Sequence, residues 1–251
     1  MTNTQQNQRS QDVLVWTDVE TTGLDPERDV VLEVGMIATD WELNHIDGVK
    51  PLHLVTHLDA VDLESMGGVA FGMHERNGLL DECVASSLRA VDASRRVAAW
   101  LEALRAGPVV LAGSSVHFDR GFLRVMAGNF KPDPLGGISH RLMDVSVLDM
   151  LADHLYPDVY AHRPERTTNH RVMACLHDSM ALYRYYRERL VCVSVVSGVS
   201  DCSDGVSGVQ DGPVMGGSGV SASAWDEGYQ IGLGDGLHGT RNVNPYRGKE
   251  S

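Results

Sequence analysis

Two carboxylates follow the first apolar run of the chain. In LVWTDVETTGLDPERD, Asp18 and Glu20 come directly after residues typical of a buried strand. Side chains two apart on a strand point to the same side, so these carboxylates can converge on one point. Ionised groups withdrawn from water are unfavourable unless a partner compensates them. Oxygen ligands suit hard cations such as Mg²⁺ or Mn²⁺, so the pair indicates a metal site.

Two later segments add residues suited to the same chemistry. Asp119 lies in SSVHFDRGFL at an expected helix start, and His170 lies in TTNHRVMACLHDSM in the expected first turn of the last helix. Two divalent ions held by carboxylates are a common arrangement for phosphodiester hydrolysis. Taken alone, Asp119 also fits a helix N-terminus favoured by the dipole. The pattern as a whole favours metal-dependent hydrolysis.

Composition sets limits on the class of protein. The chain has 251 residues, of which 43% are hydrophobic, so it can bury a substantial core. It contains no apolar run of membrane-spanning length and begins with a polar segment, so we expect a cytoplasmic protein without a membrane anchor. The net charge of −13 argues against a broad grip on long nucleic acid. Cys83, Cys175, Cys192 and Cys202 have no metal-ligand spacing.

Strand and helix patterns alternate up to about residue 190, which predicts an α/β fold with a mixed sheet flanked by helices. Residues 191–251 hold half of the 26 glycines and are expected to be a low-complexity linker and tail, and residues 1–11 a disordered segment. The expected strands are Val13–Thr17, Val30–Thr39, a segment near PLHLVTHL, and the runs PVVLAGSS and RLMDVSVL. The expected helices are Ala90–Leu104, Asp119–Met126, Ser146–Leu155 and Asn169–Leu190, with Asn169 as N-cap.

Together with MHERNGLL at 73–80 and SHRLMDVSVL at 139–148, these segments resemble the oligoribonuclease family, which are DEDD-type 3′→5′ exonucleases with a histidine base. The resemblance covers roughly residues 12–190, the expected exonuclease domain. It implies a ribonuclease H-like exonuclease fold, a homodimer, and degradation of short RNA oligonucleotides down to dinucleotides. It also implies that Asp18, Glu20 and Asp119 surround two Mg²⁺ or Mn²⁺ ions, and that His170 deprotonates the attacking water.

The resemblance extends to substrate contacts. His74, Ser115 and Arg141 match a polar cluster that caps the 5′ phosphate, and an arginine suits that contact because it can pair bidentately. Leu24 matches an apolar wedge between the two bases. His140 stands where the family usually has a tyrosine that reaches the partner subunit's site, so that stacking contact is expected to be weaker.

One departure concerns the last metal ligand. The family has an aspartate five residues after the histidine, and counting from His170 gives Cys175. A thiolate is a soft ligand that matches Mg²⁺ poorly. Asp178 lies roughly 60° around the same helix and is an alternative ligand. Catalysis is therefore expected to be weak or to prefer Mn²⁺.

Three functions remain open from the sequence. The first is an active short-RNA exonuclease, and the Gly/Ser-rich tail with its NPYR ending suggests a phage-encoded copy acting in a host cytoplasm. The second is a proofreading-type 3′→5′ DNA exonuclease, because the catalytic core is shared. The third is a dinucleotide-binding protein that lost its chemistry, which Cys175 supports.

Overall fold

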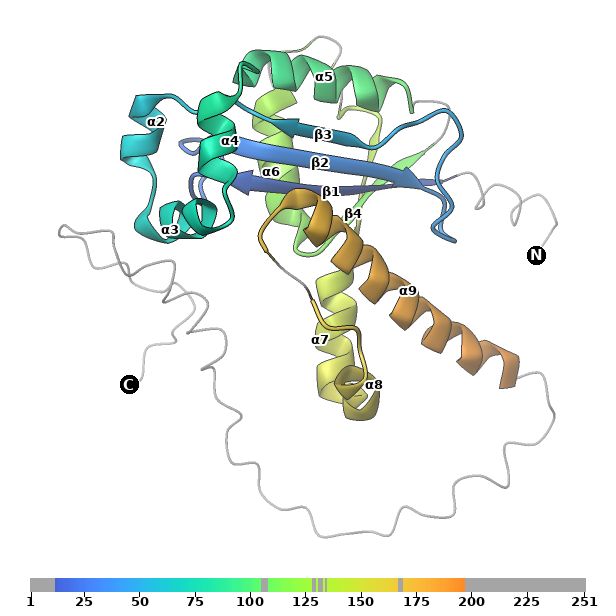
Figure 1. Ribbon diagram of the computed structural model, residues 1–251. Helices are drawn as coiled ribbons and strands as arrows, with labels where there is room; N and C mark the ends of the chain where they lie inside the picture. Colours follow the sequence, from blue (N-terminus) through green and yellow to red (C-terminus); the bar gives the residue numbers. More distant parts are fainter. Residues whose placement is uncertain are drawn as a thin grey trace, which may run out of the picture.

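The computed structural model places a five-stranded sheet between helices (Figure 1). It describes residues 12–104, 108–127, 130, 133, 135–166 and 169–196, with side chains as far as residue 189. The expected N-terminal segment 1–11 and residues 197–251 of the expected tail lie outside the described residues. Within the described part, no helix combines the length and apolar composition that crossing a membrane requires.

The sheet is mixed, as predicted. Its order is β3-β2-β1-β4-β5, with antiparallel pairing of β1 to β2 and of β2 to β3, and parallel pairing of β1 to β4 and of β4 to β5. Short connections suffice for the antiparallel strands, whereas the parallel strands need crossovers that contain helices. The strands are β1 (Val13–Thr21), β2 (Val31–Thr39), β3 (Leu52–Val55), β4 (Val109–Gly113) and β5 (Ile138–Asp144).

Three short helices between residues 60 and 85 were not expected from the sequence. They are α2 (Ala60–Ser65), α3 (Gly68–Arg76) and α4 (Leu79–Ala85). Each spans too few turns for a clear helical period, and only α2 has a side-chain N-cap, Asp59, so tertiary packing largely defines them. The remaining helices are α5 (Ala90–Glu102), α6 (Val116–Ala127), α7 (Val145–Leu155), α8 (Pro157–Ala161) and α9 (Val172–Val196).

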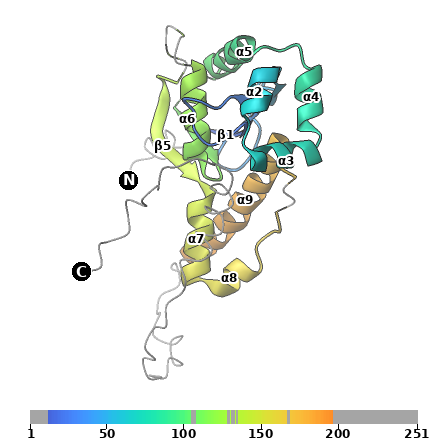
Figure 2. The same ribbon diagram turned by 90° about the vertical axis from the view of Figure 1, so that its left-hand side faces the viewer.

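Alternation along β1 divides the core into two layers. Val15 and Val19 pack in the cluster that includes residues of α5 and α6, whereas Leu14 and Trp16 pack with α7 and α9 on the other face. Figures 1 and 2 show these helix pairs on opposite sides of the sheet. Because side chains alternate along a strand, Asp18 and Glu20 share the face of Trp16. The two carboxylates therefore belong to the face that α9 covers.

The last helix differs from its predicted limits at both ends. It begins at Val172 rather than Asn169, and it continues to Val196 rather than ending at Leu190. His170 has a φ of 52°, a left-handed conformation that a right-handed helix cannot include. His170 therefore precedes α9 instead of lying in its first turn.

Candidate metal centre and active site

Asp18, Glu20 and Cys175 form a compact group of potential metal ligands. One ligand atom from each lies within 4.8 Å of the other two. The carboxylates come from β1 and the sulfur from α9, so the group depends on how closely this helix approaches the sheet. The prediction that Asp18 and Glu20 converge on one point agrees with this geometry.

A glycine in β2 makes the approach of α9 possible. Gly35 pairs directly with Asp18 in the sheet register. A Cβ added at Gly35 would lie 2.9 Å from Val172 Cγ2 and 3.0 Å from Leu176 Cδ1, closer than real side-chain contacts. Because no side chain separates them, the first turn of α9 packs on the strand and brings Cys175 to Asp18.

Asp119 reaches the end of β1 from the other layer. Its Oδ1 accepts a hydrogen bond from the backbone N–H of Val19 at 2.9 Å, and the residue is 3% exposed. Gly113 on β4 also approaches β1 closely, because a Cβ there would lie 2.8 Å from the carbonyl oxygen of Thr17. Burial raises the pKa of Asp119 well above its ordinary value, and repulsion from Asp18 and Glu20 adds to that rise.

The electrostatics of the group favour a bound cation. Burial, followed by the charge of Glu33, raises the pKa of Asp18 to about 7. Burial, followed by the charges of Asp18 and Glu33, raises the pKa of Glu20 to about 8. Asp18 Oδ2 is buried without a hydrogen-bond partner among the described residues. A divalent cation would compensate both the burial and the repulsion, so these carboxylates fit a metal of the Mg²⁺ class.

Cys175 fits such a metal less well than the carboxylates do. Burial raises the pKa of its thiol to about 12, and the charges of Asp18, Glu20 and Asp178 contribute. The thiol is therefore protonated at neutral pH unless a metal displaces the proton. Asp178 is close enough to affect this thiol, but it is not part of the described three-residue ligand group.

His170 is exposed and lies two residues before the start of α9, and Cys175 lies in the first turn of that helix. Burial lowers the pKa of His74, and the nearby charge of His170 lowers it further. The two imidazoles are therefore close enough to interact electrostatically. His74 lies on α3 and is completely buried. Its Nε2 lies 3.1 Å from the carbonyl oxygen of Thr21 and 3.9 Å from Glu20 Oε2. Contact between His74 and a phosphate would require the surrounding groups to open.

The other expected substrate residues are exposed. Leu24 is 73% exposed in the turn between β1 and β2. Ser115 has a φ of 56°, and its backbone N–H donates to Asp144 Oδ1 at 2.9 Å, which ties the start of α6 to the end of β5. His140 and Arg141 are exposed on β5. All four side chains are thus accessible to a ligand.

Sequence reasoning missed a buried carboxylate beside the site. Glu33 lies on β2 directly opposite Glu20, and its side chain is 1% exposed. It pairs with Arg171, whose Nε and Nη2 lie 3.0 and 3.1 Å from its oxygens. A single acidic residue inside the apolar run VVLEVGMIAT was the available signal. A charge buried in such a strand needs a partner, but the sequence does not identify that partner.

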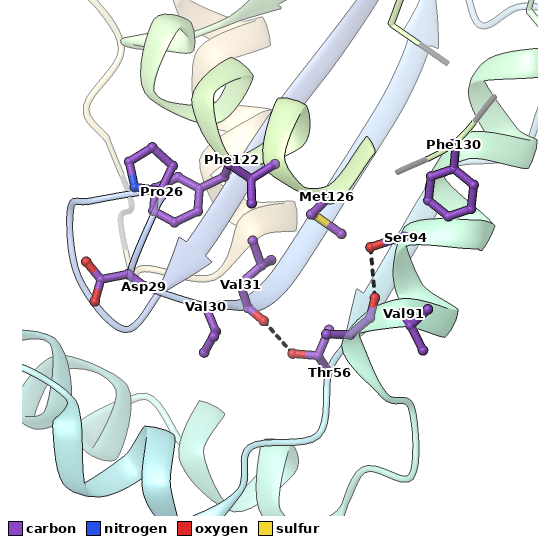
Figure 3. A pocket seen from close by; sticks show the side chains of 12 residues that line it. Pro26, Asp29, Val30, Val31, Thr56, Val91, Ser94, Phe122, Met126 and Phe130 are labelled. Atoms are coloured by element: carbon purple, nitrogen blue, oxygen red, sulfur yellow. Dashed lines mark hydrogen bonds between the residues drawn. The ribbon is translucent and has the colours of Figure 1, made fainter. Parts of the chain in front are cut away.

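A separate cavity of about 280 Å³ lies near the turn between β1 and β2, beside α5 and α6 (Figure 3). Val31, Phe122 and Met126 line it, and Figure 3 shows Pro26 and Asp29 at its border. None of the predicted site residues is among its described lining residues. The expected chemistry therefore belongs to the carboxylate group and not to this cavity.

Comparison with known proteins relates the chain to exonucleases. The Exonuclease family (RNase_T) matches residues 15–184. The oligoribonuclease of Rhodococcus jostii is 36% identical over 181 residues, which are 71% of this chain and 87% of that protein. The oligoribonuclease of Streptomyces avermitilis is 37% identical over 182 residues, again 71% and 87%.

Solved structures give a likeness in fold. E. coli exonuclease I in complex with a dT13 oligonucleotide matches with a TM-score of 0.55 at 18% identity, covering 74% of this chain and 43% of that one. Exonuclease I of Methylocaldum szegediense matches with a TM-score of 0.52 at 21% identity, covering 70% and 40%. The chain thus spans less than half the length of these proteins. The likeness identifies the ribonuclease H-like exonuclease fold.

Proposed function

Because this chain belongs to the oligoribonuclease family of exonucleases, we propose that it is a 3′→5′ exoribonuclease that degrades short oligoribonucleotides, including dinucleotides, to mononucleotides. The observation that carries the proposal is the convergence of Asp18 and Glu20 near the end of β1, where Asp119 is hydrogen-bonded to Val19 and is close enough to both carboxylates to be repelled by them. Family membership indicates the reaction, and the carboxylates and the imidazole are groups suited to it.

Asp18, Glu20 and Asp119 are the residues that would hold divalent ions, for which we propose two Mg²⁺ or Mn²⁺. Held there, such ions would lower the pKa of a bound water near neutral pH and would stabilise the leaving oxygen. We assign to His170 the acceptance of the proton from the attacking water. Its exposure supports this role, because a base must reach both substrate and solvent.

Substrate contacts are proposed for five further residues. Leu24 is free to insert between two bases, since its side chain is largely exposed. Ser115 and Arg141 are accessible for a 5′ phosphate, and His74 joins them if the protein opens around it. His140 would extend toward a partner subunit, in a homodimer that acts in the cytoplasm.

Cys175 is the observation that favours a second candidate, a dinucleotide-binding protein with weakened catalysis. Its protonated thiol stands within the ligand group where the family has a carboxylate. The relatives at 36–37% identity are named oligoribonucleases, so neither this alternative nor the DNA exonuclease is favoured over the exoribonuclease.

The substrate class can be tested with purified full-length protein and 5′-labelled RNA of two and seven nucleotides. Matched DNA oligonucleotides serve as controls, each with Mg²⁺, Mn²⁺ or EDTA. We expect stepwise loss of nucleotides from the 3′ end of both RNA substrates, and none in EDTA. Preferential cleavage of DNA would instead support the trimming exonuclease. Tight retention of uncleaved dinucleotide with either metal would support the binding protein.

A further inference from the structure

His170 has a backbone conformation that needs external support. A φ of 52° is unfavourable for a residue with a Cβ, and such residues persist where the surroundings hold them. The conformation turns the chain sharply between Asn169 and Val172, where α9 begins. The orientation of the imidazole therefore depends on what fixes this backbone.

Asn77 holds the backbone of His170 from one side. Its Nδ2 donates to the carbonyl oxygen of His170 at 2.6 Å and to that of Asn169 at 3.0 Å. Asn77 itself is fixed in the turn between α3 and α4, because its Oδ1 accepts from the N–H of Leu79 at 3.0 Å. The same corner carries His74, which is bonded to the end of β1, so the turn links that strand to His170.

Glu33 and Arg171 hold the segment from the other side. Glu33 Oε2 accepts from the N–H of Val172 at 3.3 Å, and both Glu33 oxygens pair with Arg171. The Arg171 guanidinium also pairs with both oxygens of Glu82 on α4, at 2.9 and 2.7 Å. A planar guanidinium that pairs bidentately fixes direction as well as distance. The residue after His170 is thereby tied to β2 and α4.

We propose that Glu33, Asn77, Glu82 and Arg171 form a clamp that fixes the left-handed conformation of His170 and so positions its imidazole for proton transfer. The inference rests on the proposed role of His170 as the base. These four are positioning residues, since they act through the backbone of His170. Small errors in the placement of a reacting group can reduce a rate about a hundredfold.

Asn77→Asp is the sharpest test of the clamp. It keeps the Oδ1 acceptor for Leu79, and it replaces the donor to the two carbonyl oxygens by a carboxylate oxygen that carries negative charge. We expect kcat for an RNA dinucleotide to fall about 10- to 100-fold while KM changes less than about threefold. Asn77→Ala removes the donor without adding a charge, so the two variants must agree. A wild-type kcat in both would overturn the proposal.

Arg171→Lys tests the other side of the clamp, because it keeps the charge and loses the paired geometry. It is preferable to Glu33→Gln, since the Glu33 charge also raises the pKa of Asp18 and Glu20. Asp149→Asn is the matched control. Asp149 pairs with Arg163 and accepts from Tyr186 Oη on α9, far from His170. We expect kcat to fall with Arg171→Lys alone; equal losses in the control would indicate a general structural effect and overturn the proposal.

Hydrogen exchange tests whether the clamp holds the backbone, independently of whether His170 is the catalytic base. In Asn77→Asp, the amide of Val172, which donates to Glu33, should exchange at least about tenfold faster, without a change in global unfolding. A lower kcat without faster exchange, or the reverse, contradicts the proposal. In a His170→Ala background, Asn77→Asp should lower the remaining rate less than about twofold, because the two changes remove one function. If His170→Ala keeps full activity, the assignment of the base fails even where the exchange result stands.

Discussion

Replacing Cys175 by aspartate should turn a mixed oxygen and sulfur site into an all-oxygen site. Cys175 lies within 4.8 Å of ligand atoms of Asp18 and Glu20, so an aspartate there reaches the same point. The substitution supplies the carboxylate that the resemblance to the oligoribonuclease family predicts at this position. We expect higher affinity for Mg²⁺ and faster cleavage of an RNA dinucleotide.

The magnitude follows from the proton that the thiol must lose. Its pKa of about 12 means that deprotonation at about pH 7.5 costs on the order of 6 kcal/mol before the attraction of a cation is counted. Carboxyl groups in the same site have pKa values of about 7 and 8, so they lose their protons at little cost. Only part of this difference in deprotonation free energy is expected to lower the activation barrier. We expect a gain of about one to three orders of magnitude in Mg²⁺-dependent turnover.

The assay combines calorimetric titration of Mg²⁺ with kcat and KM for a labelled dinucleotide. Cys175→Ser is the control, because it offers a neutral oxygen of similar size without a carboxylate. If Cys175→Asp matches Cys175→Ser in both affinity and rate, the assignment of this ligand position is refuted. Loss of activity in Asp178→Ala, with little gain from Cys175→Asp, would place the ligand at Asp178 instead.

Three other predictions concern the fold and the metal site. Asp18→Asn should abolish cleavage yet stabilise the metal-free protein by a few kcal/mol at about pH 8, because it removes a buried carboxylate whose pKa is raised to about 7. Chemical denaturation measures this change in stability, and a destabilised variant would contradict the prediction. Without divalent cations, the folded state binds more protons than the unfolded state between about pH 4 and 8, so thermal stability should fall as pH rises through that window. The slope of thermal stability against pH should be smaller in Asp18→Asn, and equal slopes would refute the pKa argument. Gly35→Ala should destabilise the fold by about 1–3 kcal/mol and lower metal affinity, because the added Cβ would push α9 away from β2. If the free energy of unfolding and the metal affinity are both unchanged, the close approach of α9 to β2 is unnecessary.

Much of the site follows from local periodicity. The two-residue spacing of Asp18 and Glu20 predicts a shared face, and the structure has both on the face that α9 covers. Cys175 was identified differently, from the aspartate that the resembled family has five residues after its histidine, and it lies in the ligand group. The mixed sheet was also predictable, because a hairpin followed by alternating strands and helices requires antiparallel and parallel neighbours.

The remaining features depend on contacts between distant parts of the chain. Glu33 and Arg171 are 138 residues apart, and nothing local in either segment identifies the other as its partner. The left-handed conformation of His170 likewise depends on Asn77, which lies 93 residues away. His74 is completely buried and contacts the carbonyl oxygen of Thr21, which lies 53 residues away. Periodicity describes a single element, whereas these features arise from several elements together.

The central claim is that the carboxylates at the end of β1 serve metal-dependent hydrolysis of very short RNA. The most direct measurement follows conversion of a 5′-labelled RNA dinucleotide to mononucleotides by wild-type protein and by Asp18→Asn/Glu20→Gln, with Mn²⁺ and with EDTA. We predict turnover only for the wild-type protein with Mn²⁺, and a folded but inactive double variant. Equal cleavage by the double variant, or cleavage that persists in EDTA, would contradict the account.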